Sequence, residues 1–460
     1  MSGAPERWTM SLHVLKKGLD VPIAGEVTGN IVDLPVPASV SVAPRDLPGI
    51  TPRILSREGA SVKVGTALFA DKAQPDLRLV SAAAGEVREI VRGPRRVVLD
   101  HVVSVTGDAA ESFRQWDLGA LKKISRDEAR IGLGHGGLWP VLRCRPLDKV
   151  PAMGSTPQWI LVSATETGPL APGADLLLGA GDGEALQAGL YVLKALTPGA
   201  VAVAVPQGTT HPALANLKDV DVHQFGGPHP SGDPSVQINH IAPPTGNGQV
   251  WYARAWDVAL IGRLFLEGRY PAQRVYTAAG TGLAAPRAVR TLCGAPIRTI
   301  TGDAAPGPVR WILGSVLTGQ VVDPERWAGF TNRMFTVIPD RAERRLFGWT
   351  APNLGDFSYH RAFLSGFLGA GGRKVMDTGL RGGVRSMVPV GYYRGVVATP
   401  DIEPEFLFRS IIAGDLEESV KLGLLDLSME EAALLTYVCP SKIEFDVILR
   451  DGLALYEKEA

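Results

Sequence analysis

The sequence predicts a multidomain α/β protein, and three observations carry this prediction. Short β-branched runs separated by glycine and proline fill the first hundred or so residues. Apolar strand-like runs then alternate with amphipathic helices over residues 158–270. Residues 401–460 have helical spacing throughout. The chain of 460 residues is long enough for about three domains at roughly 150 residues each.

Residues 1–110 are predicted to form a small β barrel or sandwich. Asp71-Lys72-Ala73 lies here on a turn between glycine-punctuated strands, as in lipoyl and biotinyl carrier domains. Gly65 lies 7 residues before Lys72, whereas Gly85 lies 13 residues after it, so the hairpin is asymmetric about the lysine. We therefore predict an unmodified, solvated turn lysine in a domain of carrier-like shape.

Residues 111–270 are predicted to form a linker followed by a three-layer α/β domain. The runs QWILVSA and AVAVAVP are continuous and apolar, as in buried parallel strands, and a further strand is expected at DVDVHQF. Ser125 with Glu128 predicts a capped helix start. A second helix is expected to begin near Asp182, and a third to end at Gly268.

The remaining chain is divided into three predicted parts. Strand-like runs return after Pro271, which predicts a β module over 271–335 and a β-rich segment over 336–400. A helical region is expected over 401–460, where Ser428 followed by Glu431 forms a capping-box pattern.

Composition argues against several functional classes. Lys+Arg and Asp+Glu both number 47, and a neutral chain is a poor candidate for nucleic-acid binding. Cys144, Cys293 and Cys439 are widely spaced, which favours a reducing compartment and argues against an iron–sulfur cluster. Neither a signal peptide nor a membrane span is expected.

Eight phrases, in order along the chain, resemble the A subunit of the sodium-translocating NADH:quinone oxidoreductase. They are KKGLDVPIAG, VKVGTALFADK, GLWPVLRCRP, FGGPHPSG, GRLFLEGRYPAQRVYTAAG, FGWTAP, RSMVPVGYY and YVCPSKIEFDVILRDGLALYEKE. One such phrase is weak, but eight in the same order make the resemblance specific. It covers the chain from Lys16 to the C-terminus.

The resemblance implies both a fold and a function. The family is related to the C subunit of the Rnf complex and to the flavoprotein subunit of complex I. These relatives imply a Rossmann-like unit at 158–270 and a β-grasp, SLBB-like module at 271–335. The first domain is then a barrel-sandwich hybrid without lipoylation.

The implied function is that of a peripheral subunit on the cytoplasmic face of the bacterial inner membrane, in a six-subunit complex that reduces ubiquinone. Flavins and iron centres are expected in the partner subunits. The B subunit, which lies in the membrane, is the chief expected partner. The isolated chain is expected to be inactive.

The best candidate for quinone binding is the loop GHGGLWPVLRCRPLDK. Imidazole, indole and guanidinium groups donate hydrogen bonds to quinone oxygens and stack on the ring. The alternative interpretation is an inter-domain linker whose arginines pair with carboxylates. A second loop, Ala43–Arg53, is expected to close over the same site. The candidate residues are His135, Trp139, Arg143, Arg145 and Arg45.

Other motifs favour structural interpretations. Gly179, Gly181 and Gly183 precede a helix, but the dinucleotide fingerprint requires glycine where Glu184 stands, so we expect no nucleotide site there. Cys439 is expected to be a buried structural cysteine. A metal site at His223, His229 and His240 is not expected, and Phe406 and Leu407 are candidates for a partner surface. Two other functions stay open: a purely structural cap on the membrane subunits, and an Rnf-type subunit that receives electrons from NADH through flavin.

Overall fold

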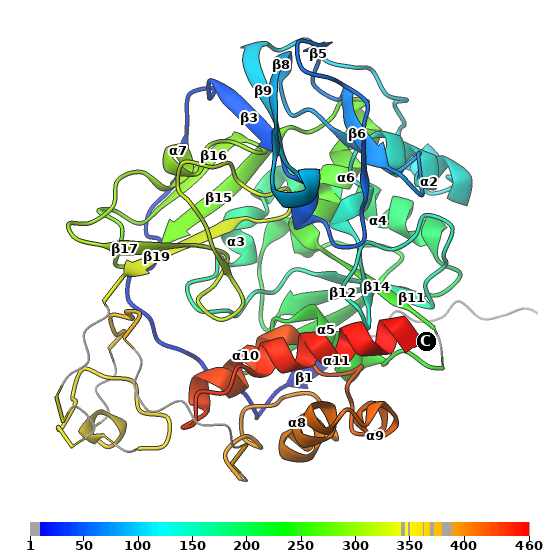
Figure 1. Cartoon of the computed structure of the whole chain (residues 1–460). Coiled ribbons are helices and arrows are strands. Elements are labelled where there is room, and N and C mark those ends of the chain that lie inside the picture. Colours follow the sequence, from blue (N-terminus) through cyan, green and yellow to red (C-terminus); the bar gives the residue numbers. More distant parts are fainter. Residues whose placement is uncertain are drawn as a thin grey trace, which may run out of the picture.

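Four β sheets organise the part of the chain that the structure describes (Figure 1). The computed structural model describes residues 10–459 apart from 247, 342–345, 348–349, 362, 369–371, 380–387 and 390. Two sheets of four and three strands form the N-terminal β domain, and two six-stranded sheets follow.

The N-terminal β domain packs two antiparallel sheets face to face, with strand orders β3-β9-β8-β5 and β4-β6-β7. Its inward positions are mostly valine and leucine, with Phe69 on β6. The strands are β3 (Ser39–Val42), β4 (Pro52–Ile54), β5 (Ser61–Val62), β6 (Ala67–Asp71), β7 (Arg78–Val80), β8 (Ala84–Arg92) and β9 (Val98–Gly107).

Lys72 lies on the turn that follows β6, with an exposed side chain. Its backbone N–H donates to the carbonyl of Thr51 at 2.8 Å. The preceding Asp71 is buried, and its carboxylate accepts the Thr51 N–H at 2.9 Å. The turn is therefore held on both sides of the lysine, and the absence of a modification stays a prediction.

The second sheet has the order β1-β13-β12-β11-β14-β10, parallel except for the edge strand β10. The continuous apolar runs form its centre, which confirms the buried-strand prediction. Two elements lie beyond the predicted alternation: β14 and α5 (Pro234–Ile241). The strands are β1 (Met10–Val14), β10 (Arg143–Arg145), β11 (Trp159–Ser163), β12 (Val201–Pro206), β13 (Asp221–Gly226) and β14 (Val250–Arg254).

Helices cover both faces of this sheet, because strand side chains alternate between two cores. Ile160 and Val162 face the core that contains α4 (Gly183–Leu196) and α6 (Ala255–Glu267). Leu161 faces the opposite core, which contains α5. α4 begins at the position predicted from Asp182, and α6 ends at Gly268 in a left-handed conformation with φ 62°.

The third sheet has the order β18-β17-β19-β15-β16-β2. Its members are β2 (Ile31–Asp33), β15 (Gln273–Ala279), β16 (Arg287–Leu292), β17 (Val309–Leu313), β18 (Gln320–Val321) and β19 (Met334–Pro339). The short helix α7 (Ile297–Thr301) packs against β15 and β16. β1 and β2 thus pair with strands of later sheets, and the N-terminal β domain itself begins at β3.

Residues 340–400 differ from the prediction of a β-rich segment. Among their described residues there is no strand, only the 3-10 helix Leu364–Gly366 and an isolated bridge between Lys374 and Ile23. Glycine and proline recur through this segment, and apolar alternation is absent, so no strand is favoured. The strand prediction is wrong for these described residues.

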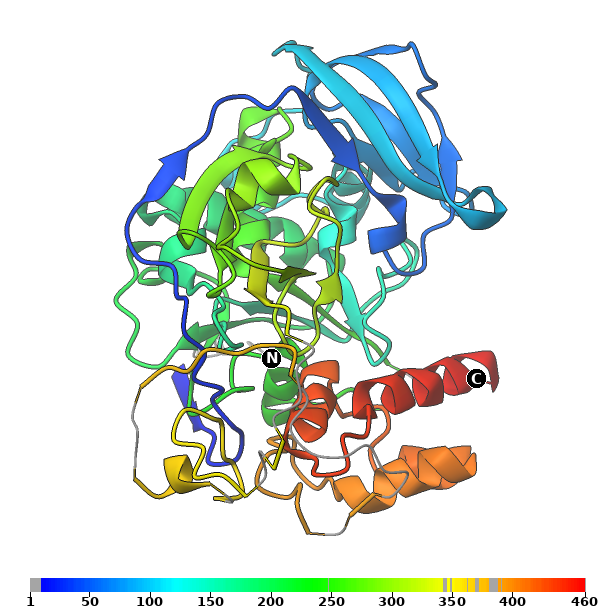
Figure 2. The ribbon, with the colours of Figure 1, turned by 60° about the vertical axis from the view of Figure 1, so that its left-hand side comes forward.

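The C-terminal helical prediction is confirmed. The helices are α8 (Pro404–Ala413), α9 (Leu416–Lys421), α10 (Met429–Val438) and α11 (Phe445–Glu459). Their shared core includes Phe408, Leu435 and Phe445. Figure 2 shows them together, on the side of the molecule away from the N-terminal β domain. Both predicted capping boxes are formed, at Ser428 of α10 and at Ser125 of α2 (Arg126–His135).

Candidate functional site

The predicted quinone loop is more ordered than its glycines indicate. α2 runs to His135, a 3-10 turn follows at Trp139–Val141, and β10 then pairs antiparallel with β14. The segment therefore places its candidate side chains in different surroundings, which are described one by one below.

Trp139 lies in the core. Its side chain is fully buried, and its Nε1 donates to the carbonyl of Pro151 at 2.8 Å. The ring meets that of Trp251 edge-on at 5.6 Å between centroids. Its donor is thus already engaged, and a direct quinone contact by Trp139 stays a prediction without support from this geometry.

Arg145 joins two regions of the chain. It is 2% exposed and donates to Asp148 at 3.2 Å. The same guanidinium group donates to three consecutive backbone carbonyls between α9 and α10, those of Leu425, Asp426 and Leu427, at 2.8–3.2 Å. This is the arrangement of the linker alternative, in which an arginine fastens the α/β sheet to the C-terminal helices.

Arg143 and Arg45 lie near this linker. Arg143 is half-buried and donates to the carbonyls of Pro140 and Leu142 on its own segment. Burial lowers the pKa of Arg143. Arg45 stands in the 3-10 turn Pro44–Asp46, and its side chain lies outside the described part of the structure. Their quinone contacts stay predictions.

His135 borders an open cavity of about 420 Å³, which we call the aromatic pocket. The wall is largely apolar and is formed by Phe113, Trp116, Ile131, Leu264 and Phe265, with Arg114 and Glu128 at the same cavity. A volume of this size falls within the usual range of small-molecule sites. Of the five sequence candidates, His135 alone is among the residues that line this pocket.

Backbone contacts hold the aromatic pocket together. In the linker, the Phe113 N–H donates to the Gly268 carbonyl at 2.8 Å, and the Trp116 N–H donates to the Phe265 carbonyl at 2.9 Å. The two linker residues therefore lie beside the end of α6. Gly132 lets the Phe265 ring approach α2, since a Cβ there would lie 2.6 Å from that ring.

Two polar groups of this pocket are fixed by carboxylates. His135 Nε2 lies 2.9 Å from Asp76 Oδ1 on the turn between β6 and β7, and the hydrogen bond from His135 lowers the pKa of Asp76. The Arg114 guanidinium lies 3.7 Å from the Trp116 ring centre and pairs with Glu128 at 2.8 Å. The pocket thus combines aromatic faces with two oriented polar groups.

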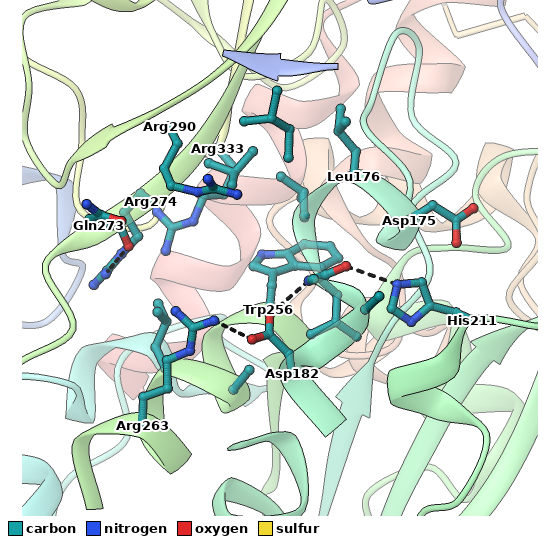
Figure 3. A pocket seen from close by; sticks show the side chains of 18 of the residues that line it. Asp175, Leu176, Asp182, His211, Trp256, Arg263, Gln273, Arg274, Arg290 and Arg333 are labelled. Carbon is teal, nitrogen blue, oxygen red and sulfur yellow. Dashed lines mark hydrogen bonds and ion pairs between the residues drawn. The ribbon is translucent and has the colours of Figure 1, made fainter. Parts of the chain in front are cut away.

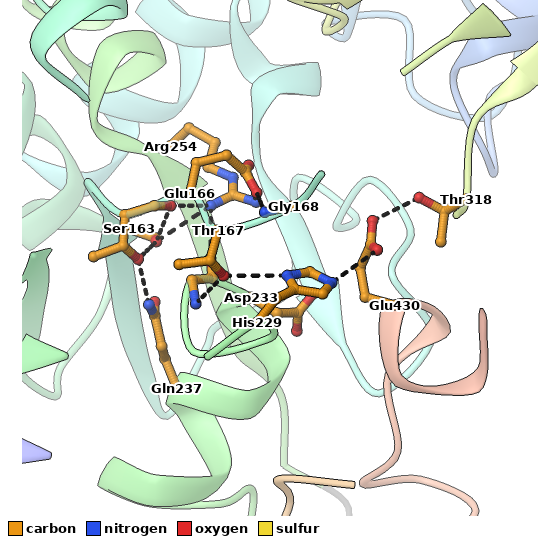
Figure 4. Close-up of polar contacts among 12 residues, drawn as sticks. Ser163, Glu166, Thr167, Gly168, His229, Asp233, Gln237, Arg254, Thr318 and Glu430 are labelled. Atoms are coloured by element: carbon orange, nitrogen blue, oxygen red, sulfur yellow. Dashed lines mark hydrogen bonds and ion pairs between the residues drawn. The ribbon is translucent and has the colours of Figure 1, made fainter. Parts of the chain in front are cut away.

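A second polar cluster lies where the chain order of the α/β sheet reverses (Figure 4). β11 has β12 as its neighbour on one side and β14 on the other. In open α/β sheets, ligands bind outside the carboxyl ends of the strands where the strand order reverses in this way. Arg254 is the last residue of β14. It donates to the carbonyls of Thr165 at 2.7 Å and Gly232 at 3.0 Å and pairs with Glu166 at 2.9 Å. If β14 had been recognised in the sequence, Arg254 at its end would have indicated this cluster.

The C-terminal helices close this edge of the sheet. His229 is 2% exposed, with Nδ1 3.1 Å from Thr167 Oγ1 and Nε2 3.5 Å from Glu430 Oε2. Glu430 stands in the first turn of α10 and accepts a hydrogen bond from Thr318 at 2.6 Å. The crevice that binds ligands in other α/β proteins is therefore occupied by a carboxylate of this chain.

The pKa values of this cluster are coupled. Burial disfavours the charged imidazole of His229, yet the Glu430 carboxylate, together with Glu166 and Asp233, raises the pKa of His229. Burial opposes the ionisation of Glu430, but His229 lowers the pKa of that carboxyl. Burial and the Glu430 charge raise the pKa of Asp233 to about 7, against the opposing charge of Arg254.

We expect docking of α10 to weaken as pH rises above the ordinary histidine pKa of about 6.5. Because the pKa of His229 is raised in the folded protein, its contribution to stability is complete below the pKa of the unfolded state. This contribution is lost as the pH rises through the pKa of the folded state. The raised pKa of Asp233 acts in the same direction at lower pH, because its contribution is lost between the ordinary carboxyl pKa of 3.8 and about 7. Hydrogen exchange of α10, corrected for intrinsic rates, should show this loss in the wild type. Glu430→Gln should remove this pH dependence of exchange, whereas Glu418→Gln, at an exposed position on α9, should leave it unchanged. An unchanged pH profile in Glu430→Gln would contradict the role of the His229–Glu430 pair.

The glycine run lacks the context of a dinucleotide site. It follows the short helix α3 (Ala174–Leu177) and not a strand, and Gly179 N–H donates to Asp182 at 2.8 Å. Glu184 lies in the first turn of α4. The turn therefore serves as an ordinary helix start.

The remaining motifs have separate partners. His223 Nδ1 lies 3.1 Å from His13, whereas His240 Nδ1 lies 2.9 Å from the Val236 carbonyl. Cys439 is buried and accepts from the Tyr393 hydroxyl at 3.2 Å, as a structural cysteine does. Within the described residues, no group of three or more His, Cys, Asp or Glu could hold a metal ion, and no helix is long and apolar enough to cross a membrane.

Comparisons with known proteins identify the family. Residues 13–106 match the NqrA N-terminal barrel-sandwich hybrid domain, and residues 124–270 match the NqrA second alpha/beta domain. Together these matches cover more than half of the chain. The chain belongs to the NqrA family. The predicted barrel-sandwich hybrid and α/β domains are thereby confirmed.

Curated relatives extend the NqrA match over nearly the whole chain. The proteins of Photorhabdus laumondii and Vibrio atlanticus are each 38% identical over 447 residues, which is 97% of this chain and 99% of theirs. That of Neisseria gonorrhoeae is 36% identical over 449 residues. All three carry the name of the A subunit of the Na(+)-translocating NADH-quinone reductase, an oxidoreductase complex.

The likeness to solved structures is weaker. An NAD+-reducing [NiFe]-hydrogenase matches 73% of this chain and 60% of its own at 12% identity. Its TM-score of 0.35 is too low to assign a fold.

Proposed function

We propose that this chain is the peripheral A subunit of a six-subunit, sodium-pumping NADH:ubiquinone reductase on the cytoplasmic face of the bacterial inner membrane. It contributes to quinone binding and to assembly, and it holds no redox cofactor of its own. Flavins and iron centres belong to partner subunits, of which the B subunit in the membrane is the chief neighbour. The relatives at 36–38% identity over nearly the full length support this proposal.

The aromatic pocket is the proposed place of quinone contact, and its chemistry is the observation that carries this function. A quinone ring is flat and apolar, with two carbonyl oxygens that accept hydrogen bonds. Trp116, Phe113 and Phe265 supply aromatic surface. Arg114 supplies the N–H donors that Glu128 leaves unused, and His135 supplies the ring nitrogen that Asp76 leaves unused. Trp139 and Arg143 act indirectly in this proposal, by holding the backbone that follows α2.

Fluorescence titration of the full chain with decylubiquinone tests the pocket. We expect saturable quenching in the wild type that is mostly lost in Trp116→Phe but kept in Trp139→Phe. His135→Ala should raise the dissociation constant by about tenfold, because a net hydrogen bond contributes about 1–1.5 kcal/mol. His223→Ala, which removes an imidazole on β13, is the matched control. Quenching that survives Trp116→Phe, with unchanged affinity in His135→Ala, would place the quinone elsewhere.

The partner surface is proposed at α8. Phe406 and Ile412 are 55% and 59% exposed there, whereas Leu407 is fully buried and serves the helical core. Exposed apolar residues on one helix are typical of a docking face. Of the two sequence candidates, Phe406 is therefore the residue available to a neighbouring subunit.

The structural-cap function is the second candidate. Arg145 and Glu430 fasten the C-terminal helices to the α/β domain, as a bracing subunit requires. The structural-cap function would be favoured if decylubiquinone left the fluorescence of the wild type and of all the variants above unchanged. The Rnf-type alternative is less supported, since the glycine run follows a helix and all three cysteines are buried and far apart in sequence.

A further inference from the structure

A second cavity of about 480 Å³ lies between the α/β domain and the third sheet (Figure 3). The turn between α3 and α4 and the outer side of α6 form one wall, and β15 and β16 form the other. Trp256, Leu176, Leu260 and Val275 make much of the surface apolar. We call it the arginine cavity, because arginines dominate its charge.

Four arginines line the cavity, against two aspartates. Three of the four have a carboxylate partner: Arg263 pairs with Asp182, Arg290 with Asp33 at 2.8 Å, and Arg333 with Asp257 at 2.5 Å. In Figure 3, Arg274, Arg290 and Arg333 come together on one side of Trp256, with His211 on the other. The wall is thus positive on one side and aromatic in the middle.

Arg274 is the unsatisfied member of this group. It is 3% exposed, and its terminal nitrogens donate to the carbonyls of Pro271 and Gln273 and to the hydroxyl of Tyr270. Its Nε has no hydrogen-bond partner, and within the described part of the chain no carboxylate forms an ion pair with it, because the nearby Asp257 is paired with Arg333. Buried charges in proteins are normally paired, because an uncompensated guanidinium is costly to remove from water. A counter-ion supplied from the cavity would complete this arrangement.

We propose that the arginine cavity binds a planar aromatic ligand that carries one oxyanion group, a carboxylate or a phosphate. The oxyanion meets Arg274 and Arg290, which suit such groups because guanidinium presents paired donors. The ring lies against Trp256 and the neighbouring leucines. This site is separate from the aromatic pocket, and the proposal does not rest on quinone binding.

Calorimetric titration of the full chain with three naphthalene probes tests the proposal. 2-Naphthoate and 2-naphthyl phosphate carry the oxyanion, and 2-naphthamide is the neutral match. We expect one anion per chain to bind, at least about tenfold more tightly than the amide, because hydrogen bonds to a charged group are stronger than those to a neutral one. The stronger of the two anions identifies the preferred group.

Variants locate the binding. Arg290→Gln changes a partly exposed residue and should weaken 2-naphthoate by about tenfold without a change in thermal midpoint, and Arg274→Gln should do so more strongly if it folds. Arg310→Gln, on β17 and paired with Asp340, is the matched control outside the cavity. Lack of saturable anion binding, equal binding of the amide, or unchanged affinity in Arg290→Gln would overturn the proposal. His135→Ala should leave 2-naphthoate binding intact, which separates this test from that of the quinone site.

Discussion

Arg145→Ala is expected to loosen the C-terminal helices from the α/β sheet, at a cost of about 3–5 kcal/mol. The substitution leaves the carbonyls of Leu425, Asp426 and Leu427 without their shared donor, and it removes the ion-pair partner of Asp148, which keeps the hydrogen bond from Tyr252. Hydrogen exchange should show α10 and α11 losing protection, while the N-terminal β domain keeps it. A regional measurement is needed because a multidomain chain need not unfold in one step.

Two controls sharpen the Arg145 result. Arg143→Ala, two residues earlier on the same strand, removes donors to the chain's own carbonyls and should cost markedly less. Arg145→Lys keeps the charge but loses the forked geometry, so it should recover part of the protection. Unaltered protection of α10 in Arg145→Ala would show that the guanidinium does not hold the two regions together.

Glu431→Ala is expected to have a comparable effect, about 3–5 kcal/mol, by leaving several buried donors unpaired. The carboxylate is fully buried and accepts four hydrogen bonds. Two come from the backbone of Ala398 and Thr399 at 2.9 and 2.8 Å, one from the Thr399 hydroxyl at 2.8 Å, and one from the Ser428 N–H at 3.3 Å. The expected observation is a lower thermal midpoint together with faster exchange around residue 398.

Ser428→Ala provides the matched comparison for Glu431. It removes the cap hydroxyl of the same helix and should cost only about 1 kcal/mol, the usual value for an N-cap. If the two substitutions destabilise equally, Glu431 acts as a local capping residue and not as a link between segments.

Local patterns were enough to predict much of the fold. The capping boxes at Ser125 and Ser428, the start of α4 and the end of α6 at Gly268 all depend on residues within one turn of each other. The strand QWILVSA was predictable because both of its faces are buried and its apolar run is unbroken. These features are determined by residues that are close together in the sequence, so they can be predicted without knowledge of the tertiary structure.

Long-range pairing explains what the sequence could not show. β1 pairs with β13 and β2 with β16, which are remote in sequence, so no local pattern marks them as members of those sheets. Arg145 and Trp139 have the chemistry of a quinone site, yet their partners lie in other segments and engage their donors. His135 lines a pocket together with aromatic residues of the linker that precedes α2. These linker residues carry no distinguishing motif, so the sequence did not reveal the pocket.

The placement of β1 and β2 also sets an order for the synthesis of the protein. β1 leaves the ribosome some 200 residues ahead of β13, a delay of about 10–40 s at ~5–20 residues per second. β2 waits still longer for β16. Both early strands must remain unpaired while the N-terminal β domain between β3 and β9 can already close on itself. The nascent chain therefore carries two open strand edges through about half of translation, and we expect chaperones to bind these segments first.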